Sequence, residues 1–219
     1  ADPTARVFEG RVYVYPSHDV PAIPGKCRDK WFCMEDYHVF SSENLIDWKD
    51  HGVIVKQPDV QWANPNNYSM WAPDCVFKDG KYYFYFPASG KERGFKIGVA
   101  TADKPYGPFT LEPTAIEGVR GIDPSVLVDK DGTSYIYYSM NKIFVARLKA
   151  NMRELDSAPQ VIDNLPPKGL LEGPFVFERN GLYYLTYPHV ENKTERLEYA
   201  IGKRPMVAWE NRTAPEWDM

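Results

Sequence analysis

The sequence predicts an all-β fold built from a repeated unit, and three observations support this. A carboxylate beside a proline or glycine, a strand, a tight turn and an aromatic strand follow one another four times. The glycines of the four turns are Gly10, Gly80, Gly132 and Gly181, at spacings of 70, 52 and 49 residues. No segment has a convincing helical period, because 19 prolines and 15 glycines interrupt the chain. Repeats of about 50 residues with several strands each are typical of a propeller or a similar array.

Each repeated unit is predicted to be a β-hairpin. Asp-Gly and Asn-Gly pairs supply the positive φ angles that two-residue turns require. The β-branched and aromatic residues on both sides of each turn suit a pleated, mostly buried sheet. A third strand is expected after each hairpin, and the four candidates are residues 37–42, 97–103, 143–147 and 198–202.

The carboxylates that begin the units are the first candidates for function. In a propeller the innermost strands converge on a central channel, so a carboxylate at the same end of each strand would reach one mouth of that channel. The candidates are Asp2, Asp74, Asp123 and Glu172. The alternative is that they are solvated turn formers, since aspartate is common beside proline.

Length and composition bound the function classes. The 219 residues suffice for one domain with a real core, and the net charge of −4 comes without a basic patch for nucleic acid. No run approaches the roughly 18 apolar residues of a membrane helix. Aromatic residues make up 15% of the chain, which fits aromatic packing or a sugar-binding surface. Cys27 and Cys33 could pair locally, but no disulfide or zinc pattern is evident, and the compartment cannot be inferred.

Two further segments bear on the site. Residues 55–68 are polar and contain proline, so we expect a long loop over the channel mouth, where loops usually carry binding residues. Residues 205–209 begin another outer turn, and a fifth hairpin would need roughly 40–50 more residues. An unclosed ring would leave open sheet edges, which favour association.

Several motifs resemble those of glycoside hydrolase family 43. They are Ala1-Asp2-Pro3, Tyr15-Pro16-Ser17-His18-Asp19, Tyr37-His38-Val39-Phe40-Ser41-Ser42, Trp71-Ala72-Pro73-Asp74, Gly121-Ile122-Asp123-Pro124-Ser125 and Glu172-Gly173-Pro174. The resemblance covers nearly the whole chain in the family's order. It implies a five-bladed β-propeller with about four blades present, and residues 1–219 as a single catalytic domain without the C-terminal blade. The family contains β-xylosidases, α-L-arabinofuranosidases and endo-arabinanases, and it inverts the anomeric centre.

The resemblance also implies catalytic roles. Asp2 would be the general base, Asp123 would set pKa and orientation, and Glu172 would be the general acid. Inversion needs the acid and the base about 6.5–9.5 Å apart, so that a water molecule fits between base and sugar. A carboxylate such as Asp123 close to Glu172 would raise the pKa of the acid and keep it protonated.

Three residues are predicted to bind substrate. Trp71 would line the sugar subsite, where a pentose ring stacks on the indole, although a core tryptophan is the alternative. Asp74 holds the carboxylate position of the repeat but matches no family catalytic residue. His18 is as well explained by a structural hydrogen bond as by a substrate contact. Of the other histidines, His38 is expected to be packed, and His189 is a candidate for the channel.

The leading functional prediction is an inverting hydrolase that releases L-arabinofuranose or D-xylose from hemicellulose-derived substrates, with exo action favoured over endo. An inactive carbohydrate-binding propeller fragment is the alternative, because the missing blade normally supplies a channel histidine. Fructan-active relatives retain configuration and need carboxyls about 5–5.5 Å apart, and the motif order fits them less well. No cofactor or metal ligand is predicted; a channel calcium is implied by the resemblance, but its usual ligand region has no counterpart here. The predicted partners are a pentose-containing saccharide and a second copy of the chain, with neither nucleic acid nor membrane.

Overall fold

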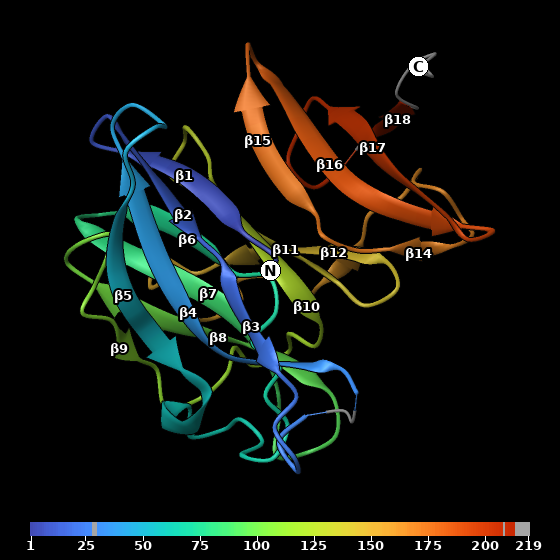
Figure 1. The fold of residues 1–219 in the computed structure, drawn as a ribbon. Helices are drawn as coiled ribbons and strands as arrows, with labels where there is room; N and C mark the ends of the chain where they lie inside the picture. Colours follow the sequence, from blue (N-terminus) through green and yellow to red (C-terminus); the bar gives the residue numbers. More distant parts are fainter. Residues whose placement is uncertain (28–29, 208, 213–219) are drawn as a thin grey trace. The chain divides into compact units, whose positions relative to one another are not determined.

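The computed structural model describes residues 1–27, 30–207 and 209–212. Within these residues every regular element is a β-strand, apart from one 3-10 turn, η1 (Gln57–Asp59) (Figure 1). The strands form four antiparallel sheets, which confirms the all-β prediction. The chain divides into two compact units, an N-terminal unit of residues 1–124 and a C-terminal unit of residues 125–219. No helix in the described part is both long and apolar enough to span a bilayer.

The first sheet is formed by the five N-terminal strands. These are β1 (Thr4–Phe8), β2 (Arg11–Tyr15), β3 (Ser17–Pro21), β4 (Phe32–Ser42) and β5 (Lys49–Lys56). Their order is β1-β2-β4-β3, with β5 also paired to β4. The β1–β2 turn is Glu9-Gly10, and both residues have positive φ, as a two-residue hairpin turn requires.

The second sheet repeats this plan in the order β6-β7-β8-β9. Its strands are β6 (Asp74–Lys78), β7 (Lys81–Ser89), β8 (Phe95–Ala102) and β9 (Thr110–Leu111). The predicted turn Asp79-Gly80 is present, with φ of +49° and +81°. The predicted third strand at 97–103 is confirmed by β8.

The third sheet corrects one prediction. It consists of β10 (Ile122–Val128), β11 (Ser134–Ser139), β12 (Ile143–Leu148) and β13 (Gln160–Val161), in that order. The expected two-residue turn at Asp131-Gly132 is wrong, because residues 129–133 form a longer loop. Its ends are closed by a hydrogen bond from the Asp129 amide to the Thr133 carbonyl oxygen, 2.8 Å long. The Asp131 carboxylate accepts the Thr133 amide within this loop, so the aspartate stabilises a turn of another type.

The fourth sheet has the order β14-β16-β17-β18, with β15 also paired to β16. Its strands are β14 (Leu170–Leu171), β15 (Phe175–Arg179), β16 (Leu182–Glu191), β17 (Thr194–Gly202) and β18 (Glu210–Arg212). The predicted Asn180-Gly181 turn joins β15 to β16, again with positive φ at both residues. Of the predicted outer turn at 205–209, residue 208 lies outside the described residues.

Aromatic side chains fill the core of each unit. In the N-terminal unit Tyr15, Tyr37 and Phe84 are fully buried in one cluster. In the C-terminal unit Tyr137 and Tyr187 are fully buried in a second cluster. A buried phenol must satisfy its hydroxyl. Tyr15 donates to the Pro105 carbonyl oxygen at 2.6 Å, and Tyr137 donates to that of Pro205 at 2.7 Å. Much of the high aromatic content therefore has a structural role.

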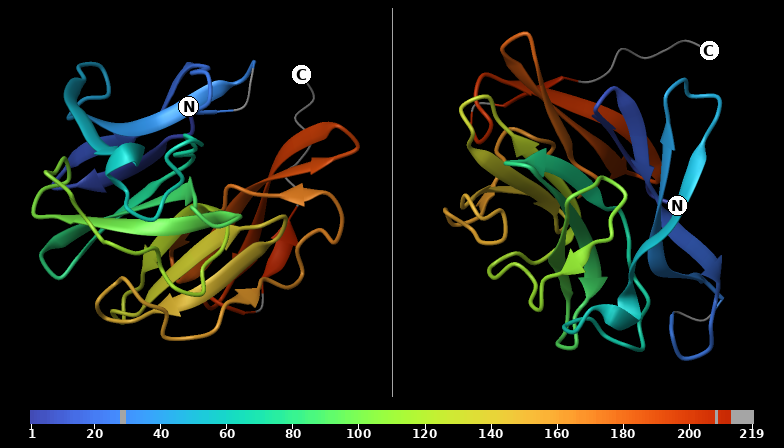
Figure 2. Two further views of the ribbon diagram at one scale, coloured as in Figure 1. Left: turned by 90° about the horizontal axis from the view of Figure 1, so that it is seen from below. Right: turned by 90° about the vertical axis from the view of Figure 1, so that its left-hand side faces the viewer.

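The segment predicted as a long loop, 55–68, begins inside β5, passes through η1 and continues without regular structure (Figure 2). Gln57 holds it together from within. The buried Gln57 amide donates to the carbonyl oxygens of Asn64 and Asn67, and its oxygen accepts the Ser69 amide at 2.7 Å. Cys27, in the connection between β3 and β4, forms a disulfide with Cys33 of β4, so the two cysteines do pair locally.

Candidate active site

Asp2 lies just before β1, where its backbone is held by β3. The Asp2 amide donates to Ser17 Oγ at 2.9 Å, and Ser17 Oγ donates in turn to Asp19 Oδ1 at 3.2 Å. Asp2 is exposed to solvent, yet desolvation by neighbouring groups raises the pKa of its carboxyl above the ordinary value; the chain's amino group opposes this rise and the negative charge of Asp19 adds to it. A carboxylate with a raised pKa is a stronger base than one in water.

Asp123 is buried at the start of β10 and has an unusual backbone. Its φ is +54°, in the left-handed region that residues with a side chain rarely occupy. Aspartate tolerates this region better than most residues, yet such conformations are concentrated at functional sites. The conformation of Asp123 therefore marks this position as a candidate site on grounds independent of its motif.

Tyr37 of β4 brings these two acids together. Its phenol is fully buried, which is the main reason that its pKa is raised well above the ordinary value. The negative charges of Asp123 and Asp2 both raise this pKa further, so both carboxylates lie within electrostatic reach of one hydroxyl. The same hydroxyl donates to the carbonyl oxygen of Trp71 at 2.6 Å. Sequence reasoning missed Tyr37 as a site residue, although its strand was among the family motifs.

Glu172 lies in the C-terminal unit, between β14 and β15. The Glu172 amide donates to the Pro188 carbonyl oxygen at 3.5 Å, and Gly173 follows with φ of +52° beside the Pro188 ring. The segment is therefore held against β16 on both sides of Leu171, which pairs with His189.

His189 of β16 holds the segment before Glu172 in place. Its side chain is buried, and Nδ1 lies 2.9 Å from Glu198 Oε1 while Nε2 lies 2.9 Å from the Lys168 carbonyl oxygen. Burial opposes a charge on the imidazole, but the hydrogen bonds to Glu198 and Lys168 and the charge of Glu198 outweigh it, so the pKa of His189 is raised. The sequence made His189 a candidate for the channel. The structure instead makes it a buried support for the residues that lead to Glu172.

Trp71 is partly buried against the core of the N-terminal unit, with its ring 4.6 Å from that of Phe95. The Tyr37 hydroxyl donates to the Trp71 carbonyl oxygen, so the backbone of Trp71 is hydrogen-bonded to the same tyrosine whose pKa is raised by Asp123 and Asp2. A sugar-stacking role for Trp71 stays a prediction that agrees with this position.

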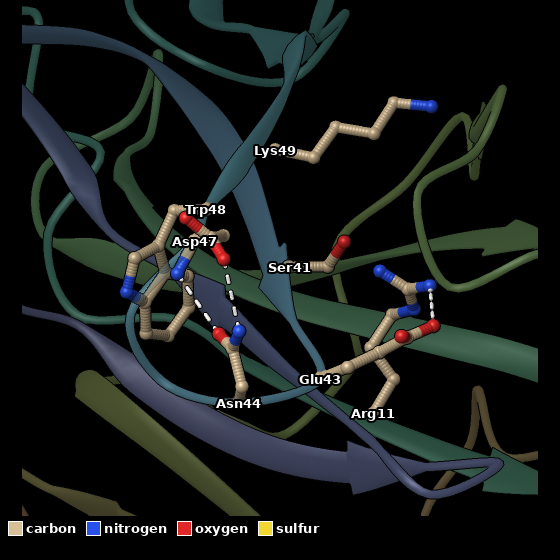
Figure 3. Close-up of a pocket in the computed structure, with 7 residues that line it drawn as sticks. All are labelled: Arg11, Ser41, Glu43, Asn44, Asp47, Trp48 and Lys49. Carbon is tan, nitrogen blue, oxygen red and sulfur yellow. Dashed lines mark hydrogen bonds and ion pairs between the residues drawn. The ribbon is translucent and has the colours of Figure 1, made fainter.

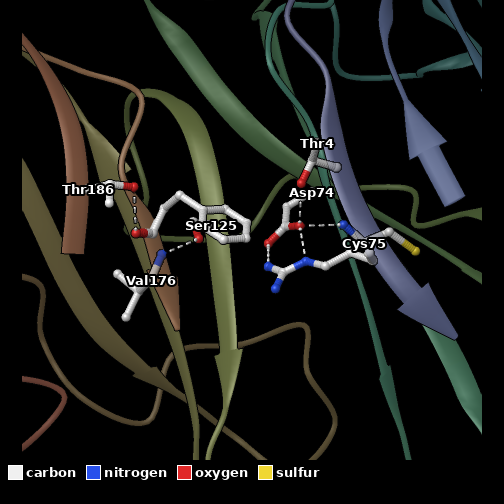
Figure 4. A network of polar contacts seen from close by, with 8 residues as sticks. Thr4, Asp74, Cys75, Ser125, Val176 and Thr186 are labelled. Carbon is white, nitrogen blue, oxygen red and sulfur yellow. Dashed lines mark hydrogen bonds and ion pairs between the residues drawn. The ribbon is translucent and has the colours of Figure 1, made fainter. Parts of the chain in front are cut away.

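Asp74 is almost completely buried and has internal partners (Figure 4). Arg6 binds both of its oxygens, through Nε at 2.9 Å and Nη2 at 2.5 Å. Thr4 Oγ1 and the Cys75 amide also donate to Oδ1. These bonds give Asp74 a structural role in joining β1 to β6, and they explain its carboxylate without a ligand. A substrate contact at Asp74 stays a prediction.

His18 lies on the opposite face of its sheet from Tyr37. It is bonded to Asp36, which precedes Tyr37 in β4, and successive residues of a strand face opposite sides. Its Nδ1 lies 2.8 Å from Asp36 Oδ1, which agrees with the structural alternative for His18. Contact between His18 and substrate stays a prediction.

A surface pocket lies elsewhere in the N-terminal unit and contains none of the predicted site residues. Its polar groups bond to one another: Asn44 donates to Asp47 Oδ2 at 2.9 Å, and Arg11 pairs with Glu43 (Figure 3). The polar groups of this pocket, most of them in the turn after β4, are therefore already paired with one another. The lining residues are Arg11, Ser41, Glu43, Asn44, Asp47, Trp48 and Lys49.

Residues 1–216 match the family model described as glycosyl hydrolases family 43. The chain belongs to this family. A xylosidase/arabinosidase of Bacteroides ovatus is 36% identical over 94% of this chain and 74% of its own length. A beta-xylosidase of Xylanibacter ruminicola is 35% identical over 94% of this chain and 76% of its own length. A xylosidase/arabinosidase of Humicola insolens is 49% identical over 63% of this chain, which spans 42% of that relative.

Solved structures of the family agree with the fold. A family 43 beta-xylosidase/alpha-arabinofuranosidase from a compost metagenome, in a calcium-free complex with xylotriose, has a TM-score of 0.84 and 32% identity, over 97% of this chain and 76% of the other. A Xanthomonas citri enzyme in complex with xylotriose has a TM-score of 0.82 at the same identity, over 97% and 72%. The predicted β-propeller fold class is therefore confirmed, as are the family and its glycosidase class.

The group of metal-binding side chains that the described residues bring together suits calcium poorly. The one group of at least three histidine, cysteine or acidic side chains within metal-binding reach among them is His18, Asp36 and His38. Calcium takes six to eight oxygen ligands, whereas this group has two imidazoles and one carboxylate.

Proposed function

We propose that this chain forms the catalytic site of an inverting glycosidase that releases D-xylose or L-arabinofuranose from xylan-derived or arabinoxylan-derived oligosaccharides. The observation that carries the proposal is the family 43 match over residues 1–216, in a chain whose acids Asp2, Asp123 and Glu172 stand in motifs that resemble the family's. The names of the relatives, xylosidase and arabinosidase, and the xylotriose in two similar structures support pentose substrates.

The proposed chemistry uses one base and one acid. The Asp2 carboxylate takes a proton from a water molecule, whose oxygen then bonds to the anomeric carbon from the face opposite the leaving group. The bond from that carbon to the glycosidic oxygen breaks, and Glu172 gives its proton to this oxygen. One water is consumed, the free sugar has the inverted configuration, and solvent returns Asp2 and Glu172 to their starting protonation states.

Asp123 and Trp71 have supporting roles in this proposal. Asp123 places a second negative charge in the site, which keeps a proton on the acid and orients the base. Trp71 offers an aromatic face to a pentose ring. Its position is fixed through the bond from Tyr37, so that the sugar would be held next to the acids.

The test is hydrolysis of p-nitrophenyl β-D-xyloside and α-L-arabinofuranoside by the chain and by its variants Asp2→Asn and Glu172→Gln. Each variant should lose about 10²–10⁴-fold or more in kcat, because each removes one proton-transfer group. Asp103→Asn, an exposed carboxylate paired with Lys81, is the matched control and should retain activity.

Proton NMR of the first product separates the remaining alternatives. The proposal expects the anomer of inverted configuration, and a retained anomer would refute the assigned roles of Asp2 and Glu172. A folded chain that binds xylotriose without hydrolysing either substrate would favour a carbohydrate-binding role instead. Light scattering with size-exclusion chromatography tests the predicted homo-oligomer.

A further inference from the structure

We propose that His18, Asp36 and His38 form a binding site for one divalent transition-metal ion of the zinc type. This site is separate from the proposed glycosidase chemistry and does not depend on it. The three side chains belong to two paired strands of the first sheet, His18 to β3 and the other two to β4.

The strand geometry places the three side chains on one face. Asp36 and His38 are two residues apart in β4, so they face the same side of the sheet. Ser17 of β3 pairs with Tyr37 of β4, so the next residue, His18, lies opposite Asp36, just before the register shifts towards Asp19. The imidazole rings of His18 and His38 meet edge to face, with centroids 5.1 Å apart.

The distances are close to those of a metal site. His18 Nδ1 lies 2.8 Å and His38 Nε2 lies 3.8 Å from the same atom, Asp36 Oδ1. One ligand atom from each residue lies within 4.8 Å of the others. Zinc bonds of about 2.0–2.2 Å in a tetrahedral site separate neighbouring ligand atoms by about 3.3–3.6 Å. The two measured separations lie on either side of this value, so small rotations of the side chains would satisfy a bound ion.

The surroundings of His38 Nδ1 favour a ligand role for its other nitrogen. His38 Nδ1 is buried and forms no hydrogen bond with the part of the chain that the structure describes, but Asp50 Oδ1 lies 3.5 Å away. The Gly52 amide donates to the same Asp50 atom at 2.7 Å and holds it in place. A proton on Nδ1 directed at Asp50 leaves the lone pair of Nε2 facing Asp36. A carboxylate behind a histidine in this way is the usual outer partner of a metal ligand.

Access and ligand type indicate which ion would bind. The side chain of His18 is 44% exposed, whereas those of Asp36 and His38 are 8% and 23% exposed, so an ion would enter from the His18 side and keep water there. Two imidazoles and one carboxylate suit zinc, copper, nickel or iron, and suit calcium poorly. Phe40 stacks on His38 with an interplanar angle of 14°, which restricts the ring.

Metal binding would affect the fold more than the chemistry. Tyr37, between Asp36 and His38, faces the other side of the sheet, where Asp2 and Asp123 lie near it. A metal ion would link β3 to β4 next to Ser17, whose hydroxyl oxygen accepts a hydrogen bond from the Asp2 amide. We therefore expect a rise in thermal stability, since a ligand bound only by the folded state stabilises it.

The test is zinc titration of the chelator-treated chain by isothermal calorimetry, with cobalt absorption spectra as a second readout. The proposal expects one zinc per chain, a melting temperature that rises with zinc, and affinity at least tenfold weaker in His18→Asn and in His38→Asn. His51→Asn is the matched control: His51 lies in the same sheet but is bonded to Ser41, so its loss should leave affinity unchanged. Asp50→Asn should weaken binding about tenfold.

Several results would overturn the proposal. They are the absence of saturable zinc binding, binding that survives in both His18→Asn and His38→Asn, and binding that is lost in His51→Asn. Equal competition by calcium would indicate an oxygen-rich site elsewhere and would also count against it. Because His18 is partly exposed, its substitution should leave the fold intact, which circular dichroism of the metal-free variant verifies.

Discussion

Replacing Asp74 with asparagine tests whether this acid is structural. Asparagine keeps the shape but removes the charge, so the guanidinium of Arg6, whose side chain is only 18% exposed, would lose the negative charge that Asp74 supplies. Breaking one side of a buried ion pair costs about 3–5 kcal/mol of unfolding free energy. In a chain of this length each kcal/mol shifts the melting temperature by about 2–4 °C, so Asp74→Asn should melt about 6–20 °C lower.

Differential scanning fluorimetry measures this shift, and Asp103→Asn provides the control in the same sheet. Lys81 Nζ lies 2.7 Å from Asp103 Oδ1, but the Asp103 side chain is 82% exposed, so solvent screens the pair and no measurable shift is expected. The KM of folded Asp74→Asn should equal that of the unmodified chain. An unchanged melting temperature together with a raised KM would refute the structural role and restore Asp74 as a substrate contact.

Three further predictions concern the segment before Glu172 and the base. His189→Gln should lose most stability at low pH. Because the pKa of His189 is raised in the folded state, its contribution to stability is complete below the unfolded-state pKa near 6.5 and is lost as the pH rises through the folded-state pKa. The melting temperatures of the variant and the unmodified chain should therefore converge at high pH. Gly169→Ala should lower both stability and activity, because its φ is +86° and a Cβ would lie 2.6 Å from the Val190 carbonyl oxygen. Gly80→Ala, with positive φ but open space, should show a smaller loss of stability and unchanged activity. The acid limb of kcat/KM should lie above the ordinary aspartate pKa, because desolvation by neighbouring groups raises the pKa of Asp2. A limb at or below that value would contradict the assignment of Asp2 as the base.

The turns and strands could be predicted because their determinants are local. Asp79-Gly80 and Asn180-Gly181 occupy positive φ, as short hairpin turns demand, and the aromatic runs beside them became strands. The same dipeptide at Asp131-Gly132 led to a wrong prediction. There the strands end at Val128 and begin at Ser134, and the side chain of Asp131 closes a longer loop.

The histidines show where sequence reasoning stops. His189 and His18 both follow aromatic or β-branched strands, and nothing in their neighbours distinguishes a buried support from an exposed ligand. The difference lies in partners far along the chain or across a strand pair. Glu198 and the Lys168 carbonyl oxygen occupy both nitrogens of His189, whereas His18 meets Asp36 across the β3–β4 strand pair.

The sequence alone determined the fold class, the family and the identity of the three candidate acids, because hairpin turns, strand alternation and motif order are written in neighbouring residues. Only the tertiary structure decided the environment of each acid. It buried Asp74 in an ion pair with Arg6 and brought Asp2 and Asp123 within electrostatic reach of Tyr37. It also hydrogen-bonded His189 to Lys168, in the segment that leads to Glu172. The physical reason is that burial and charge act through space, between residues that are distant in sequence, such as Tyr37 and Asp123.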